Sequence, residues 1–84
     1  MKNILVYSGP FCNFCEAAKN LLKRNKLEFK EIDVSEGPEI REEMVKKANG
    51  KRTIPQIFFN EDHVGGYQEL RELEKSGKLL SSLE

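Results

Sequence analysis

The alternation of apolar and polar residues predicts four strands and three main helices in the order β-α-β-α-β-β-α, followed by a short C-terminal helix. The run Asn3 to Ser8 is rich in β-branched residues and is typical of a strand buried on both faces. The run Leu27 to Val34 alternates apolar and charged residues except at Lys30-Glu31, and this slip indicates an edge strand or a bulge. Two further strands, Gln56 to Asn60 and His63-Val64, are joined by a tight turn.

The helices are predicted from apolar residues spaced three and four positions apart. The first begins at about Asn13, and its apolar stripe consists of Phe14, Ala17, Ala18, Leu21 and Leu22. The second has Ser35 as a candidate N-cap and ends at Asn49-Gly50. Its apolar positions are Ile40, Met44, Val45 and Ala48. Gly65-Gly66 ends the last strand, and a third helix begins at about Tyr67.

The lengths of the connections predict the topology of the sheet. Residues Gly9 to Lys26 are numerous enough to join two parallel strands, whereas the tight turn between the last two strands makes that pair antiparallel. We therefore expect an α/β fold, with a mixed four-stranded sheet and helices on both faces, in one domain that spans residues 1–84. The predicted core consists of Ile4, Val6, Leu21, Ile32, Ile57 and Phe59.

Composition narrows the range of partners. The 14 basic residues balance the 14 acidic ones, so the overall charge gives no reason to expect nucleic acid or an anionic membrane as partner. No apolar stretch approaches the roughly 18 residues of a membrane span. The apolar run near the N-terminus is too short for a signal peptide. We therefore expect a cytoplasmic protein.

The only two cysteines, Cys12 and Cys15, lie one helical turn apart. A structural disulfide between them would close a very small loop, for which chain entropy contributes only roughly 2 kcal/mol. Zinc needs four ligands, and the chain offers these two thiols and His63, so no metal site is predicted. In a reducing compartment, a redox-active pair is the remaining interpretation.

The position of the pair at a helix start predicts different roles for its members. At the N-terminal cap, Cys12 meets unpaired backbone N–H groups and the positive end of the helix dipole, which favour its thiolate. Such thiols have pKa values lowered from about 8.5 to the range of about 3.5 to 7.5. Cys15 lies one turn along and faces inward, so Cys12 is predicted to be the nucleophile and Cys15 the resolving thiol.

Three motifs in this order resemble the glutaredoxin family: Cys12-Asn13-Phe14-Cys15 after a strand, Thr53-Ile54-Pro55 opening a strand, and Gly65-Gly66 opening a helix. The resemblance covers Met1 to about Leu80 and is nearest to the compact bacterial-type dithiol glutaredoxins. It implies a thioredoxin fold. It also implies a glutathione-dependent oxidoreductase that reduces protein–glutathione mixed disulfides and protein disulfides, with glutathione and such proteins as its partners.

The same resemblance implies where glutathione binds. Thr53, Ile54 and a cis Pro55 would face the cysteines, and the backbone of Ile54 would pair with the cysteinyl part of glutathione as a short extra strand. The helix N-terminus formed by Gly66, Tyr67 and Gln68 would bind the γ-glutamyl carboxylate.

Three other side chains have implied or open roles around glutathione. Arg41 or Arg52 would bind the glycyl carboxylate, since the arginine fork matches a carboxylate. Phe14 either stacks over substrate or begins the apolar stripe of its helix. Away from these residues, Tyr7 is expected in the core, and His63 is expected to be solvated or a local hydrogen-bond partner.

The chain departs from the family pattern at several positions. Asn13 replaces the usual proline, Phe14 a common tyrosine and Gly9 a common lysine, while Tyr67-Gln68 replaces a small residue or cysteine followed by aspartate. Relatives without that proline can, as dimers, bind a [2Fe-2S] cluster through the first cysteine and glutathione, which supplies a second hypothesis. The missing lysine and aspartate support a third, reduction by thioredoxin reductase. We expect a monomer, and the sequence leaves open whether ribonucleotide reductase is a partner.

Overall fold

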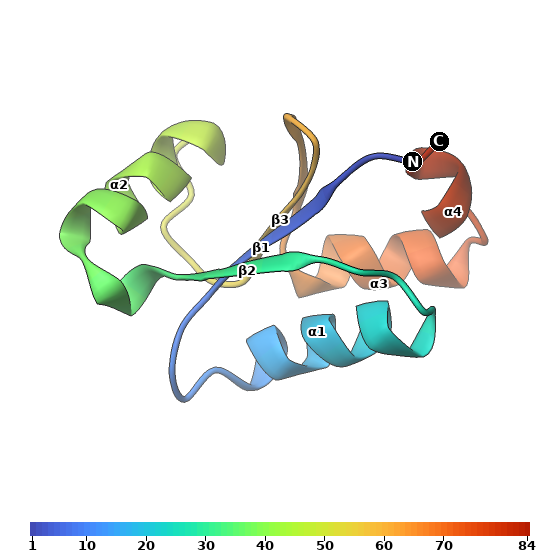
Figure 1. Ribbon diagram of the computed structural model, residues 1–84, viewed down its shortest axis with the longest axis horizontal. Coiled ribbons are helices and arrows are strands. Elements are labelled where there is room, and N and C mark those ends of the chain that lie inside the picture. Colours follow the sequence, from blue (N-terminus) through green and yellow to red (C-terminus); the bar gives the residue numbers. More distant parts are fainter.

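The order of elements in the computed structural model, which describes all 84 residues, is the predicted one (Figure 1). The strands are β1 (Ile4–Ser8), β2 (Lys30–Asp33), β3 (Gln56–Phe59) and β4 (Asp62–Gly65). The α-helices are α1 (Asn13–Arg24), α2 (Pro38–Lys47), α3 (Tyr67–Lys75) and α4 (Leu79–Ser82). One 3₁₀ turn, η1 (Val34–Glu36), lies between β2 and α2.

The four strands form one mixed sheet in the order β2-β1-β3-β4. β1 is parallel to β2 and antiparallel to β3, with Val6 opposite Ile57, and β3 is antiparallel to β4. The predicted topology is therefore confirmed, and β2 lies at the edge. The one register shift is in the pairing of β3 with β4, where Ile57 lies opposite Gly65 and Phe58 opposite His63, and the pairing of β2 with β1 is regular.

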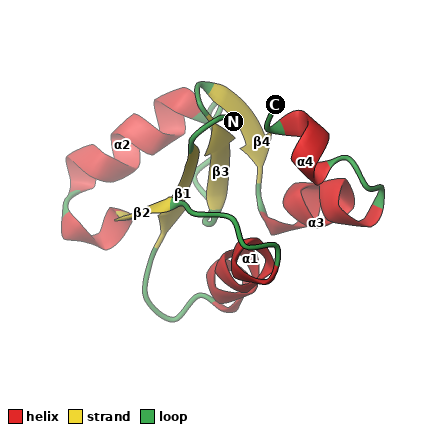
Figure 2. Cartoon of the chain, turned by 45° about the vertical axis from the view of Figure 1, so that its right-hand side comes forward, coloured by secondary structure: helices red, strands yellow, loops and turns green.

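Helices cover both faces of the sheet. Figure 2 shows α2 on one side and α1 with α3 on the other. The core on the α1 and α3 side contains Ile4, Val6, Ala18, Leu21, Leu22, Leu27, Ile57, Phe59, Leu70, Leu79 and Leu83. The smaller core under α2 contains Tyr7, Val34, Met44, Ala48 and Phe58. Of the predicted core, only Ile32 is not fully buried, because its strand has a neighbour on one side only.

Three predicted strands are longer than the observed ones, and the third of them, β3, ends at Phe59 rather than at Asn60. The second covers only Lys30–Asp33: Leu27 is buried but precedes the strand, and Val34 already begins η1. The first begins at Ile4 rather than at Asn3. Alternation alone does not locate the point where two backbones come within hydrogen-bonding distance, and this point ends each strand.

The predicted N-cap of the second helix, Ser35, is wrong. Ser35 belongs to η1, where its backbone N–H donates to Asp33 Oδ1 at 2.8 Å. The helix α2 instead begins at Pro38 after an extended Gly37. Proline suits this first position because it has no N–H to leave unpaired.

The ends of the chain lie side by side (Figure 1), where the N–H of Lys2 donates to the carbonyl of Leu83 at 2.6 Å. The longest helix, α1, has 12 residues, and none of the helices has the length and apolar character required to cross a bilayer.

A polar cluster joins the C-terminal end of α1 to α3. Glu74 accepts two hydrogen bonds from the Arg24 guanidinium, at 2.6 and 3.0 Å, and one from Asn25 Nδ2 at 2.8 Å. These donors, Arg24 first and Asn25 second, lower the pKa of Glu74 to about 2. A carboxylate whose pKa is lowered by folding stabilises the protein above its unfolded pKa and loses that contribution as the pH falls through the folded pKa.

We expect Glu74→Gln to lower the melting temperature by roughly 2–4 °C at pH 7, since solvent screens a pair at the surface. The difference from wild type should shrink as the pH falls from about 4.5 towards 2, because protonation removes the same charge from the wild type. Thermal melts followed by circular dichroism across this range measure it. Glu72→Gln, an exposed neighbour without an ion pair, is the control, and equal shifts in the two variants would contradict the assignment.

Candidate active site

Cys12 is the N-cap of α1. Its backbone is extended, and its Sγ accepts a hydrogen bond from the N–H of Cys15 at 3.1 Å. The two cysteines form a disulfide, with their Cα atoms 5.2 Å apart. The same sulfur lies 3.8 Å from the carbonyl oxygen of Ile54. After reduction, an anionic Cys12 sulfur is suited to accept the same N–H, because thiolates at helix starts are stabilised by the free amides there.

The two sulfurs differ in accessibility. Cys15 is fully buried in the interior, whereas Cys12 is half-buried and lies between two exposed residues, Phe11 and Asn13. Phe11 has a positive φ of 54° and projects its whole ring into solvent. Only Cys12 is therefore placed to meet a disulfide on another molecule.

A groove of about 310 Å³ lies beside Cys12, between the start of α1, the segment before β3 and the start of α3. The residues that line it are Phe14, Thr53, Ile54, Pro55, Gly66, Tyr67, Gln68 and Glu69. All of them except Glu69 were predicted from the sequence, and the fold brings them together. The volume lies at the lower end of the range for small-molecule sites.

Unpaired backbone groups face this groove. The Ile54–Pro55 peptide bond is cis, as the resemblance implied. The N–H of Ile54 has no partner within the protein, and neither do the N–H groups of Tyr67 and Gln68 at the start of α3. A strand-like edge and a helix N-terminus thus both line the groove, and they are suited to a peptide backbone and a carboxylate respectively.

Glu69 is a groove residue that the sequence analysis missed. Its Oε1 accepts a hydrogen bond from the N–H of Gly66 at 2.6 Å, which is one half of a capping box. The spacing from a glycine N-cap to a glutamate three residues later was the available signal. Gly65 leaves room for this side chain, because a Cβ there would lie 2.7 Å from Glu69 Oε1 and the residue has a φ of +124°.

Phe14 is a wall of the groove and not part of the core. Its side chain is 58% exposed, and its ring stacks on Tyr67 with centroids 5.8 Å apart and planes inclined by 26°. The buried stripe of α1 therefore begins at Cys15, which corrects the predicted stripe. The contact spans residues far apart in sequence, so helical spacing alone did not reveal it.

Gly9, where the family commonly has a lysine, lies against the side chain of a groove residue, Ile54. A Cβ at Gly9 would lie 2.8 Å from Ile54 Cδ1, so the Ile54 side chain occupies the space beside this glycine. A lysine at this position would require Ile54 to move.

Neither candidate arginine lines the groove. The Arg41 guanidinium donates to the backbone carbonyl of Arg52 at 2.7 Å, and Arg52 lies 3.3 Å from a carboxylate oxygen of Glu42. These contacts hold the segment that leads to Thr53. Binding of the glycyl carboxylate by either arginine stays a prediction.

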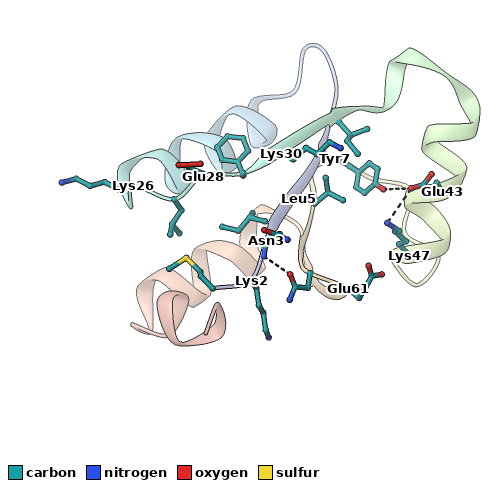
Figure 3. A pocket seen from close by; sticks show the side chains of 16 residues that line it. Lys2, Asn3, Leu5, Tyr7, Lys26, Glu28, Lys30, Glu43, Lys47 and Glu61 are labelled. Atoms are coloured by element: carbon teal, nitrogen blue, oxygen red, sulfur yellow. Dashed lines mark hydrogen bonds and ion pairs between the residues drawn. The ribbon is translucent and has the colours of Figure 1, made fainter.

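The largest hollow in the surface lies elsewhere, along β1, the edge strand β2 and the end of α2, and contains none of the predicted site residues (Figure 3). Figure 3 shows the Tyr7 phenol pointing towards Glu43, to which it donates at 3.3 Å. Tyr7 is buried against Phe58, as expected of a core residue, and burial raises its pKa. No group of three or more His, Cys, Asp or Glu side chains is placed to hold a metal ion.

Known proteins resemble this chain both in sequence and in fold. The Glutaredoxin family model matches residues 4–64. A glutaredoxin of Pseudomonas aeruginosa is 43% identical over 79 residues, covering 94% of this chain and 93% of that protein. The solution structure of a glutaredoxin from Brucella melitensis is 47% identical with a TM-score of 0.86, covering 99% of this chain and 89% of the other. A buckwheat glutaredoxin–glutathione complex is 25% identical with a TM-score of 0.87, covering 98% and 76%.

Proposed function

This chain belongs to the glutaredoxin family and is a thiol-disulfide oxidoreductase with a thioredoxin fold, and from that membership we propose that glutathione is its reductant. Its proposed substrates are protein–glutathione mixed disulfides and protein disulfides. The observation that carries the proposal is the half-buried sulfur of Cys12 at a helix start, 3.8 Å from the carbonyl of Ile54, whose N–H has no partner.

The groove matches the chemistry of glutathione, a short peptide with two carboxylates and one ammonium group. Its cysteinyl N–H and C=O would pair with the carbonyl and N–H of Ile54, as in a β-ladder, and this pairing would bring its sulfur to Cys12. The γ-glutamyl carboxylate would accept from the N–H groups of Tyr67 and Gln68. The Glu69 carboxylate, on the same wall, would attract the neighbouring ammonium group. The complex of the buckwheat relative with glutathione supports this choice of ligand.

With a glutathionylated protein, the Cys12 thiolate attacks the glutathione sulfur. The new bond joins Cys12 to glutathione, and the protein thiolate leaves and takes a proton from solvent. A second glutathione thiolate then attacks the glutathione sulfur on Cys12, which releases oxidised glutathione and regenerates the Cys12 thiolate. One free glutathione thiol is consumed and one protein thiol is released, while the disulfide passes to oxidised glutathione, so atoms and electrons balance.

With a protein disulfide, Cys12 attacks one substrate sulfur and the other leaves as a thiol. Cys15, one turn along α1, then attacks Cys12 Sγ, releases the second substrate thiol and closes the Cys12–Cys15 disulfide present in the structure. Two glutathione molecules reduce this disulfide through a mixed disulfide on Cys12. The burial of Cys15 suits it to this internal step alone.

A comparison of electron donors tests the proposal. We expect the purified protein to reduce a glutathionylated peptide when supplied with glutathione, glutathione reductase and NADPH. With thioredoxin reductase and NADPH but no glutathione, turnover should stay at the level without enzyme. Turnover supported by thioredoxin reductase alone would contradict the proposal and favour the third hypothesis.

No feature of the site favours the iron–sulfur hypothesis. The hypothesis needs a dimer in which two Cys12 thiolates and two glutathione thiolates supply the four ligands of a [2Fe-2S] cluster, and it stays a prediction. We also propose that the protein acts as a monomer in the cytoplasm, where the glutathione pool that the reaction consumes is kept reduced.

A further inference from the structure

Behind the groove, a buried polar chain connects the Thr53–Pro55 segment to β4. Gln56, the first residue of β3, is 1% exposed, and its Nε2 donates to the Thr53 carbonyl at 3.0 Å and to Thr53 Oγ1 at 3.2 Å. Its Oε1 lies 2.6 Å from His63 Nε2 on β4. The site described above uses neither Gln56 nor His63.

The hydrogen bonds fix the direction of this chain. Because both amide protons of Gln56 go to Thr53, its Oε1 is an acceptor, and His63 Nε2 carries the proton that it accepts. His63 Nδ1 is then free to accept from Asn49 Nδ2, 3.2 Å away at the end of α2. The imidazole ring also packs on Phe58, with centroids 5.0 Å apart and planes inclined by 31°.

The surroundings of His63 favour the neutral ring that this arrangement uses. Burial lowers the pKa of His63, and the charge of Lys51 lowers it further, against a smaller opposing effect of Glu69. The Nε2 proton is present in both the neutral and the charged ring, so the bond to Gln56 does not depend on this titration.

We propose that His63 is a positioning residue which, through Gln56, holds Thr53 and thereby the backbone of Ile54 in the geometry that receives the cysteinyl unit of a glutathione-bonded substrate; this inference rests on the proposed function. The residue transmits position and does not touch the reacting sulfurs. His63 would therefore set the preference of Cys12 for a disulfide that carries peptide groups over one that carries none.

The physical reason is that the segment has few other attachments. Residues 51–55 belong to no helix or strand. On the exposed side the segment is held by the hydrogen bond from Arg41 to Arg52, by the contact between Arg52 and Glu42, and by the N–H of Lys51, which donates to the carbonyl of Ala48 at 3.1 Å. The amide of Gln56 provides its buried hydrogen bonds, and the imidazole of His63 holds that amide in its orientation. A donor–acceptor pair on a substrate backbone needs the Ile54 groups within a few tenths of an ångström, and small misplacements are costly in reaction rate.

The test uses the Cys15→Ser protein, in which the Cys12–glutathione mixed disulfide cannot be resolved internally. The equilibrium constant for its formation from oxidised glutathione, with release of one reduced glutathione, is compared with the constant for 2-hydroxyethyl disulfide. The second disulfide has no peptide groups to pair with Ile54. The ratio of the two constants measures recognition of the glutathione backbone.

His63→Phe keeps a ring on Phe58 and removes the donor to Gln56. We expect it to lower the ratio about 3–10-fold, the effect of one net hydrogen bond. His63→Gln retains an N–H that can reach Gln56 and should restore most of the ratio. Gln56→Met, of similar volume, should give the same loss, and combining it with His63→Phe should add little, because both changes break one chain of hydrogen bonds.

An unchanged ratio in His63→Phe would overturn the inference and leave the proposed function standing. Equal falls in both constants would also overturn it, since they would mean that His63 affects Cys12 or the fold as a whole. A parent protein without preference for glutathione would instead overturn the proposed function and this inference together. If His63→Phe does not fold, Gln56→Met and His63→Gln supply the same comparison.

Discussion

Cys12→Ser should abolish turnover of both classes of disulfide, with a loss of more than about 1,000-fold in rate. Both proposed routes begin with attack by the Cys12 sulfur, and a serine hydroxyl is not ionised at neutral pH and is a poor nucleophile towards sulfur. Cys15 does not replace it, because Cys15 is fully buried and no substrate sulfur can reach it. The measurement is NADPH oxidation coupled to glutathione reductase, with a glutathionylated peptide and a protein disulfide as separate substrates.

The matched control is Asn20→Ser, which introduces the same side chain on the exposed face of α1 and should keep full activity. Circular dichroism should show that both variants keep the helices and the sheet. Residual turnover in Cys12→Ser above the rate without protein would contradict the assignment of the nucleophile. It would then point to a sulfur other than Cys12 at the reacting centre.

The second large effect is expected from Cys15→Ser, and it should separate the two activities. Reduction of a glutathionylated peptide needs only Cys12 and a second glutathione, so its rate should stay within about threefold of wild type. Reduction of a protein disulfide should fall by about 100-fold or more, because an internal thiol has an effective concentration far above that of free glutathione.

Both rates are measured in the same coupled assay at the same glutathione concentration. A difference between the two rates then cannot arise from a difference in the reductant. A thermal melt of Cys15→Ser shows how much of any common loss arises from unfolding. Equal losses in the two assays by a folded protein would refute the one-cysteine route and leave the route through Cys15 as the only one.

Much of the fold was predictable because it depends on local patterns. The helix after Cys12 follows from apolar spacing, and the β3–β4 hairpin follows from a short polar turn between apolar runs. The position of Cys12 at a helix N-cap, with Cys15 one turn inward, also follows from local spacing, and the structure has this arrangement. The cis Pro55 was predicted from family resemblance and not from local physics.

Other features were decided by contacts between distant segments. Phe14 lies on the groove because Tyr67 stacks on it, and Glu69 enters the site because Gly65 carries no side chain in its path. Ile32 is only partly buried because its strand lies at the sheet edge, a consequence of strand order that no single strand encodes.

The predictable features and those decided by tertiary contacts differ in how far apart in the sequence the interacting residues lie. Periodicity and capping depend on residues within a turn or two of one another, so the amino-acid order alone specified the elements and the asymmetric cysteine pair. The groove, the direction of the Asn49–His63–Gln56–Thr53 hydrogen bonds and the packing of Ile54 beside Gly9 depend on the distances between elements that the sheet brings together. Those distances exist only once the sheet has assembled.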